Sequence, residues 1–351
     1  MASDLSGRVT FANGLAASGV EVRVFDRDAP GKEDDDLTIT PGISDESGFF
    51  RVIYDPGRYR DFASLPFIGL GGSSRSRLRV PDLFDIYSPY VRFRYNFDGQ
   101  ERTHTEDLEP FENRFQLPET IPHHFKPSRH GFRFGNAFSG YMLPFSVPFL
   151  ADSRVPGVYG LCGGMSAGAA DFLLFGREIP EMYEPPRRGT KLHRYLFRRA
   201  IDSFALGESI IRFARWMFLP EEGLNGTRRL TFKEWSRIRT DLDNQCLVPL
   251  GQVRSKASNL QEAARHVWQN HQVLAYGYTE KDDGAVDIFI YDPNCPAADD
   301  VFIHIEQVQV GEEAGVPVYG LTCYESDCWE KRRPLRGFFA MPYEPVEPPA
   351  L

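Results

Sequence analysis

The sequence predicts an α+β protein in which a β-sandwich over residues 1–115 precedes a second domain over residues 131–351. Two observations predict this division. In the first hundred residues apolar side chains alternate with polar ones, which is the period of half-buried strands. After residue 130 helical spacing mixes with strand patterns, and 351 residues are enough for two cores. The Pro-containing residues 116–130 are predicted to form a linker, and the second domain ends in a Pro-rich tail.

Alternation and turn signals justify the sandwich. Val20, Val22 and Val24 alternate with charged neighbours, and the same period recurs over residues 50–54 and 91–97. Turn-forming pairs and runs stand between the strands, at residues 13–14, 45–48 and 71–74. Short strands separated by such turns are typical of a β-sandwich.

These segments resemble the transthyretin-like, or carboxypeptidase-regulatory-like, sandwich over residues 5–100. A G-V-x-V strand, Gly19-Val20-Glu21-Val22, precedes a D-x-x-G-x-F hairpin that runs from Asp45 to Phe50. The resemblance implies an accessory module without catalytic residues. We interpret the acidic run over residues 33–36 as a solvated loop rather than a calcium loop.

The second domain is predicted to combine helices with a β-hairpin. Helical patterns begin at Cys162, cover residues 191–204 and 208–218, and recur after a capping box formed by Ser258 and Gln261. The helix that follows this box carries Leu260 on its apolar face. It leads into a strand over residues 270–278, a turn over residues 281–284 and a return strand over residues 286–292.

Cys162 has the sequence context of an activated thiol. Glycines flank it in the segment from Gly160 to Gly164, and a helical pattern begins directly afterwards. A thiol reacts as its thiolate, and both a helix N-terminus and a neighbouring imidazolium lower its pKa from about 8.5. The glycines also leave room for a substrate backbone at the sulfur. A structural Cys in a tight turn would share these features, so a nucleophile also needs a nearby base.

The predicted hairpin supplies a candidate base. A turn centred between Asp282 and Asp283 places His271 opposite Asn294, and a slip of two residues places it opposite Asp292. Side chains repeat with period two along a strand, so both alternatives lie on the same face. A carboxylate or amide beside an imidazole fixes its tautomer and direction, as a catalytic base requires. A core His bonded to a loop Asp would give the same pattern.

The two segments, in this order, resemble papain-like cysteine peptidases over residues 130–343. In that family a Gly-containing turn presents the Cys at the start of the central helix, and the base lies in an [ND]-H-x-V-x-[AV]-x-G-Y strand, which residues 270–278 match. Gly163 and the strand end Tyr291-Asp292-Pro293 resemble bacteriocin-processing peptidases in particular. The resemblance implies that Cys162 is the nucleophile, His271 its base and Asp292 the orienting residue, with Asn294 as the alternate.

The sequence departs from the family at the oxyanion hole. The family usually carries a Gln a few residues before the nucleophile, where this chain has Pro156, Gly157 and Val158. The backbone N–H of Cys162 is one expected donor, and the side-chain amide of Asn136 or Gln252 is a candidate for the other.

These features predict a cysteine hydrolase, a peptidase or isopeptidase that acts on a peptide or protein substrate through a thioester. A transglutaminase, deamidase or acyltransferase would use the same triad, because all share the acyl-enzyme. A different class of answer is a non-catalytic binding protein, or a delivered effector, built on a retired peptidase fold.

Composition excludes several other classes. The net charge of −9 argues against nucleic-acid binding, and no apolar run approaches the roughly 20 residues of a membrane span. No CxxC or HExxH motif occurs, so we expect neither a metal nor a cofactor. The N-terminus has no basic start and no apolar stretch. We therefore expect a protein made in the cytoplasm, any export using a non-classical route.

The five cysteines are expected to be reduced. Cys323 and Cys328 are close enough in sequence to bridge across a turn, but a reduced pair is the prediction. Cys295, next to Asn294, is interpreted as a bystander because it follows a Pro and lies outside any helix start.

Overall fold

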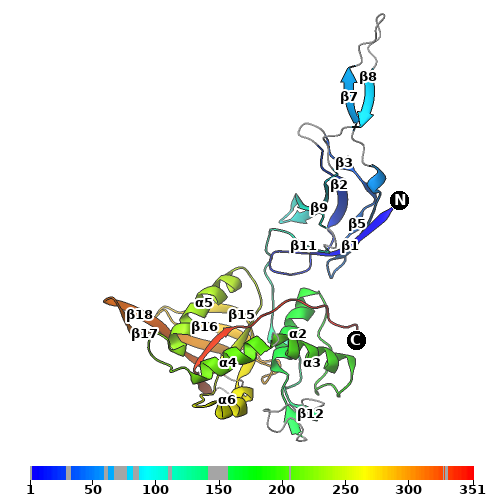
Figure 1. Cartoon of the computed structure of the whole chain (residues 1–351). Coiled ribbons are helices and arrows are strands. Elements are labelled where there is room, and N and C mark those ends of the chain that lie inside the picture. The colour runs from blue at the N-terminus through cyan, green and yellow to red at the C-terminus, as the bar shows by residue number, and fades with distance from the viewer. Residues whose placement is uncertain are drawn as a thin grey trace, which may run out of the picture. The chain divides into compact units, whose positions relative to one another are not determined.

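The computed structural model describes residues 2–28, 33–58, 62–66, 77–81, 87–109, 113–140, 157–204, 207–326, 328 and 331–351. It contains both helices and sheets, as predicted for an α+β protein, and it divides into two compact units, Met1–Glu119 and Thr120–Leu351 (Figure 1). The predicted turn over residues 71–74 lies outside the described residues.

The first unit is a β-sandwich. One sheet has the order β11-β1-β6-β4, and its strands are β1 (Ser3–Thr10), β4 (Thr38–Thr40), β6 (Phe49–Tyr54) and β11 (Arg114–Gln116). The other has the order β10-β9-β2-β3, with β5 also paired to β2, and comprises β2 (Glu21–Asp26), β3 (Asp35–Asp36), β5 (Gly42–Ile43), β9 (Pro89–Phe97) and β10 (Gln100–Asp107). A short helical turn, η1 (Pro56–Arg58), and the paired strands β7 (Phe62–Pro66) and β8 (Arg77–Pro81) complete the elements of this unit.

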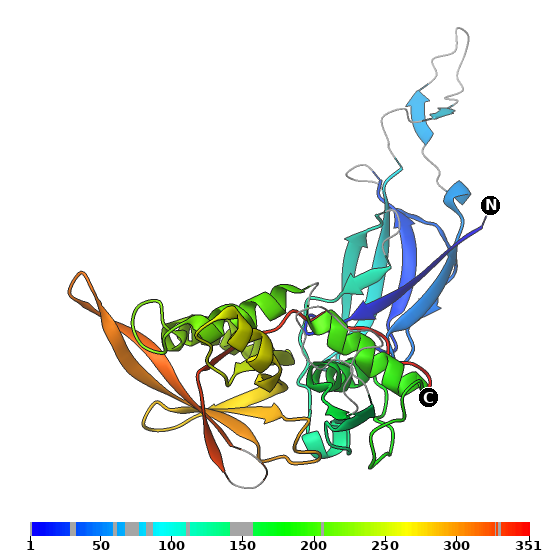
Figure 2. The same cartoon turned by 60° about the horizontal axis from the view of Figure 1, so that its bottom comes forward.

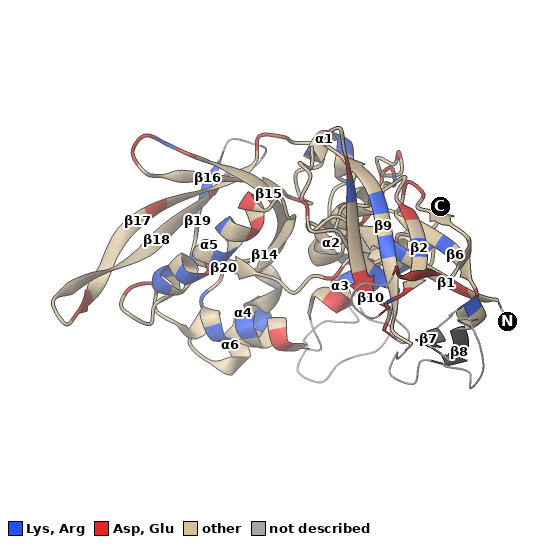
Figure 3. Ribbon diagram, turned by 90° about the horizontal axis from the view of Figure 1, so that it is seen from above, with Lys and Arg blue, Asp and Glu red and all other residues tan. Residues whose placement is uncertain are grey.

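The predicted alternation is confirmed in the sandwich core. Val22 and Val24 of β2 are fully buried, together with Phe93 of β9 and other apolar side chains from both sheets. The intervening residues face outward, where Figure 3 marks the basic positions of β9 in blue. Within the acidic run Asp36 accepts a hydrogen bond from Arg23, at 2.9 Å, so this carboxylate is engaged by the sandwich itself.

The boundary between the units falls between residues 119 and 120, inside the predicted linker. Residues 116–119 belong to the first unit and residues 120–130 to the second. Leu117 is buried in the sandwich core, whereas Phe125 packs in a core of the second unit, just before α1 (Pro127–His130). Buried apolar side chains on both sides of the boundary explain why the Pro-containing segment is not a free spacer.

The second unit is built on a seven-stranded antiparallel sheet with the order β19-β18-β17-β16-β15-β14-β20. In Figure 2 these strands are coloured from yellow to red, and they comprise β14 (Val248–Val253), β15 (His271–Glu280), β16 (Val286–Tyr291), β17 (Phe302–Glu313), β18 (Val316–Ser326), β19 (Arg332–Leu335) and β20 (Gly337–Ala340). The two edge strands are consecutive in the chain, with Arg336 alone between them. The sheet must therefore curl until its edges approach each other.

Helices cover both faces of this sheet. Trp235, Ile238 and Leu242 of α5 (Thr227–Asp243) share a core with Val273 of β15, on the concave face. The next residue along the strand, Leu274, packs in a second core on the opposite face with side chains of α2 and α3. The other helices and strands are α2 (Cys162–Leu174), α3 (Lys191–Ser203), α4 (Glu208–Phe218), α6 (Leu260–His266), η3 (Val267–Gln269), β12 (Phe138–Gly140) and β13 (Gly157–Tyr159). Among the helices that the structure describes, none combines the length and the apolar character needed to cross a bilayer.

The helix before β15 starts later than the capping-box prediction. Asn259 is the N-cap, and its side chain accepts a hydrogen bond from the backbone N–H of Glu262. The side-chain carboxylate of Glu262 accepts one from the N–H of Ser258. The reciprocal pair thus involves Glu262 rather than Gln261. Leu260 is 80% exposed, so the predicted apolar face was wrong at this position.

Candidate active site

Cys162 is the first residue of α2, where the sequence predicts it. The first backbone hydrogen bond of this helix runs from the N–H of Met165 to the carbonyl of Leu161, so the N–H groups of Cys162 and Gly163 have no partner one turn earlier. The side chain of Cys162 is half-buried. A thiol here lies at the positive end of the helix dipole, which favours its thiolate.

The glycines beside Cys162 allow close packing of the surrounding elements. A Cβ at Gly164 would lie 2.0 Å from the backbone oxygen of Leu196 in α3. One at Gly163 would lie 2.4 Å from the side chain of Gln272 in β15 and 2.5 Å from that of Ser203. Room for a substrate is therefore not needed to explain them, because α3 and β15 already approach too closely for a side chain.

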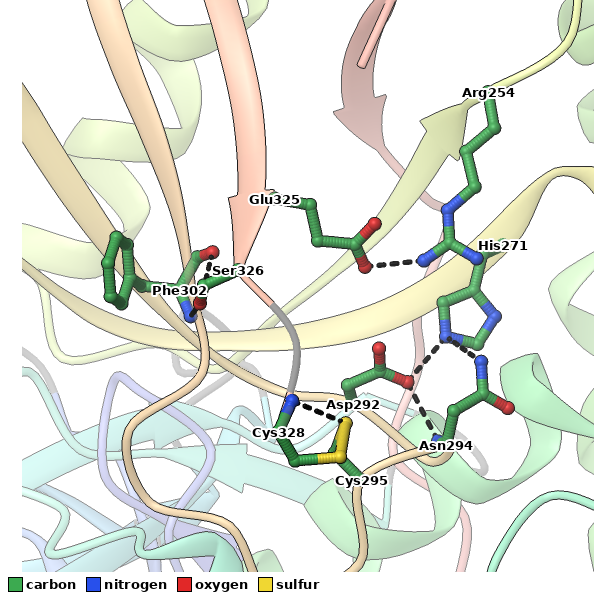
Figure 4. The surroundings of a disulfide bond; sticks show 9 residues. All are labelled: Arg254, His271, Asp292, Asn294, Cys295, Phe302, Glu325, Ser326 and Cys328. Carbon is green, nitrogen blue, oxygen red and sulfur yellow. Dashed lines mark hydrogen bonds and ion pairs between the residues drawn. A yellow bond between two sulfur atoms is a disulfide. The ribbon is translucent and has the colours of Figure 1, made fainter. Parts of the chain in front are cut away.

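His271 is the first residue of β15, and a carboxylate engages its ring (Figure 4). Its Nε2 lies 2.6 Å from Oδ1 of Asp292 and 3.2 Å from the side-chain amide of Asn294. His271 and Asp292 are 4% and 3% exposed. Both residues that the hairpin pattern proposed thus contact the imidazole, and Asp292 makes the shorter contact.

The hairpin register explains this contact. Leu274 pairs with Tyr291, which is the register predicted from the turn, and a bulge between Ala275 and Gly277 shifts only the part of the hairpin away from the site. After Tyr291 the chain turns, and Oδ1 of Asp292 accepts a hydrogen bond from the N–H of Asn294 at 2.7 Å. The hydrogen bond within this turn therefore orients the carboxylate toward the imidazole.

The environment of Cys162 favours its ionised form. Burial raises the pKa of the thiol, but a hydrogen bond and the charge of His271, with the backbone N–H groups of Gln272 and Gly163, outweigh burial and lower it below its usual value. Since Asp292 engages Nε2 of His271, Nδ1 is the ring nitrogen left to exchange a proton with the sulfur.

The charges around His271 favour the imidazolium. Burial and the nearby Arg254 lower the pKa of His271, but Asp292 and Cys162 raise it to about 9. Burial raises the pKa of Asp292. The charge of His271 and hydrogen bonds from His271 and the N–H of Asn294 outweigh burial, so the pKa of this carboxyl lies below its usual value. The charges of the site thus favour the thiolate of Cys162, the imidazolium of His271 and the carboxylate of Asp292.

Asn136, a candidate for the oxyanion-hole side chain, lies beside the start of α2. Its Oδ1 accepts a hydrogen bond of 2.5 Å from the N–H of Leu161, the residue before Cys162, and its backbone N–H donates to the carbonyl of Pro293. Its Nδ2 lies 3.4 Å from Oδ1 of Asn294. The amide is half-buried and retains a donor beside the start of α2.

Gln252 is less suited to this role. It lies opposite His271 in the pairing of β14 with β15, but it is fully buried and its Oε1 accepts a hydrogen bond from Arg254 at 2.9 Å. A substrate oxygen has no access to a side chain that solvent cannot reach. The structure therefore brings Gln252 next to His271 without exposing it to a substrate.

Sequence reasoning missed two links around the site. Cys295 forms a disulfide with Cys328, with a Cα–Cα distance of 5.6 Å. The expectation of five reduced cysteines was therefore wrong. Cys295, three residues after Asp292, has no free thiol and instead ties this segment to Cys328. Glu325 and Arg254 also form an ion pair near the imidazole (Figure 4). Neither link had a local signal, because each joins residues more than 30 positions apart.

Comparisons with known proteins leave the family open. No family model and no curated protein matches the chain. Among solved structures, the chain is similar to a 9R-lipoxygenase from Cyanothece PCC8801, with a TM-score of 0.21 and 14% identity, over 84% of this chain and 40% of the lipoxygenase chain. So low a TM-score carries no argument about fold or function.

Proposed function

We propose that the protein is a cysteine hydrolase that cleaves a peptide or isopeptide bond through a thioester on Cys162. The observation that carries the proposal is the 2.6 Å contact between His271 and Asp292, made next to a thiol at a helix N-terminus. The order of the parts also supports a papain-like domain: a helix that presents the Cys, then a strand that begins with the His, then the orienting carboxylate.

The proposed reaction uses each group in turn. The Cys162 thiolate attacks the carbonyl carbon and forms a C–S bond, while the N–H of Cys162 and the amide of Asn136 hold the developing oxyanion. The His271 imidazolium gives its proton to the leaving nitrogen as the C–N bond breaks. Neutral His271 then takes a proton from water, which attacks the thioester, and the C–S bond breaks to release the acid and restore the thiolate.

The acceptor of the acyl group decides the reaction subtype. Water gives hydrolysis, whereas an amine gives transglutamination or acyl transfer from the same intermediate. A peptide or protein is the proposed substrate because the chemistry acts on amides. The sandwich would serve as an accessory module, since every proposed catalytic residue belongs to the second unit.

Selective alkylation tests the proposal without a known substrate. We expect iodoacetamide to modify Cys162 at least about tenfold faster than Cys246 at about pH 6.5, because an ordinary thiol is only about 1% ionised there. Cys246 is the matched internal control: it is also half-buried, but burial and Asp241 raise its pKa. Peptide mapping by mass spectrometry would identify the modified thiol. Equal rates at the two cysteines would contradict an activated nucleophile.

A further inference from the structure

An ion pair between a partly exposed arginine and a buried glutamate lies beside the proposed catalytic residues. Nη2 of Arg254, the residue after β14, donates to the carboxylate of Glu325 in β18 and to Oε1 of Gln252, the latter at 2.9 Å. Glu325 is 2% exposed and Arg254 is partly exposed. Charged side chains are seldom buried unless a partner of opposite charge compensates them. Removing the Glu325 carboxylate from water costs free energy, which its contact with Arg254 offsets.

The ion pair spans the concave face of the curled sheet. β14 and β18 are separated by three strands, which in a flat sheet would place them about 19 Å apart. That is farther than the two side chains can reach, so direct contact depends on the curl. Gln252 and His271 are neighbours across β14 and β15, at the same alternate positions as the core residues Leu250 and Val273. The ion pair therefore lies on the same face of the sheet as the side chain of His271.

A disulfide reinforces the link between the two chain segments. Cys295 follows Asp292 by three residues, in a turn closed by the 2.8 Å hydrogen bond from its N–H to the carbonyl of Asp292. Cys328, its partner, follows Glu325 by three residues. The turn that carries the orienting carboxylate is thus covalently tied to the end of the strand that carries Glu325.

Four charged groups meet at His271. They come from the segment after β14, the end of β16, β18 and the start of α2, and they are Arg254, Asp292, Glu325 and Cys162. Positive Arg254 opposes the imidazolium. Burial raises the pKa of Glu325, whereas Arg254 and His271 act to lower it, so its ionised carboxylate and the imidazolium favour each other. Arg254 also acts on the carboxylate of Asp292, so it is a cation that could compete with His271 for that carboxylate.

We infer that Glu325 is a positioning residue: by pairing with Arg254 it neutralises that cation beside His271 and leaves Asp292 free to orient the imidazole. This role rests on the proposed function, because it acts through the catalytic His rather than on a substrate. It predicts that removing the charge of Glu325 changes the titration of the site and not merely its stability.

The rate of Cys162 alkylation provides a readout of the charge on His271. Anionic iodoacetate is attracted by an imidazolium, whereas neutral iodoacetamide is not. The ratio of the two rates is therefore high while His271 is charged and falls when it loses its proton. In the wild-type protein we expect the midpoint of this fall near pH 9, where His271 titrates.

Glu325→Gln should move this midpoint down by about one pH unit, because Arg254 then acts uncompensated on the imidazolium. Arg254→Gln should move it in the opposite direction, since a buried carboxylate would remain beside His271. Glu325→Asp, which keeps the charge, should restore the wild-type midpoint. The opposite shift expected for Arg254→Gln keeps the test decisive if Glu325→Gln does not fold.

Asp287→Asn is the matched control. Asp287 is also a buried carboxylate of the same sheet, and it pairs with His304 at 2.6 Å, so this variant should leave the midpoint unchanged. A midpoint unaltered in both Glu325→Gln and Arg254→Gln would overturn the role of Glu325 alone. A wild-type protein in which the ratio does not fall with pH would instead overturn the proposed function itself.

Discussion

Replacing Cys162 by alanine is expected to lower turnover by at least about 10⁴-fold while leaving the fold intact. In the proposed reaction the sulfur is the atom that forms the bond to the substrate, so no neighbouring group can replace it. Cys162→Ala removes a single half-buried atom, and we expect the free energy of unfolding to change by no more than about 1 kcal/mol. Turnover of a peptide library and urea unfolding monitored by circular dichroism would measure the two effects.

Cys246→Ala is the control for the loss of a thiol. Cys246 is half-buried, like Cys162, but burial and the charge of Asp241 leave its pKa above the usual value. This variant should retain wild-type turnover. Turnover that survives in Cys162→Ala would remove this residue from the mechanism, and with it the thioester.

Asp292→Ala is expected to lower turnover by about 10²- to 10⁴-fold. Asp292 holds Nε2 of His271 at 2.6 Å and is the main group that raises the pKa of the imidazole. Its loss leaves the ring free to rotate or to take the wrong tautomer. It also makes the imidazolium lose its proton at lower pH, so the alkaline limb of the pH–rate profile should move to lower pH. Steady-state rates measured across the pH range would report both changes.

Asn294→Ala is the matched comparison, because the side chain of Asn294 contacts the same ring nitrogen at 3.2 Å. We expect a smaller loss than in Asp292→Ala, since an amide carries no charge to stabilise the imidazolium. The remaining Asn294 should also give Asp292→Ala a residual rate. If Asn294→Ala were the more damaging substitution, the orienting role would belong to the amide instead.

Features with a local pattern were predicted well. The alternation of Val22 and Val24 with charged neighbours identified strands of the sandwich, because a strand with one buried face imposes that period. The position of Cys162 at a helix start and the hairpin register next to His271 followed from glycines and turn residues close by in sequence.

Features made by distant residues were not predictable in this way. The contact between Arg254 and Glu325 depends on the curl of a seven-stranded sheet. The curl arises because the consecutive strands β19 and β20 pair with β18 and β14, at opposite ends of the sheet, and no single segment predicts this pairing. The disulfide likewise joins Cys295 to Cys328, whereas sequence proximity pointed to Cys323. Cys323 instead lies buried in the core between the sheet and α5.

Local signals also failed where two choices were close in energy. Ser258 and Asn259 can both cap a helix, and the structure uses Asn259, which turns Leu260 out to solvent. The predicted linker, residues 116–130, contains the boundary between the units, but the burial of its side chains had no local signal. Its prolines indicate an irregular path, but Leu117 and Phe125 anchor that path in two separate cores.

The claim that His271 holds Cys162 as a thiolate can be measured directly by ultraviolet absorbance. The difference in thiolate absorbance between the wild-type protein and Cys162→Ala, recorded as a function of pH, reports the ionisation of this one sulfur. We expect the difference to appear with a midpoint well below the ordinary thiol pKa of about 8.5, and His271→Ala to abolish that low-pH signal. A difference that develops only above about pH 8.5 in the wild-type protein would contradict an activated Cys162.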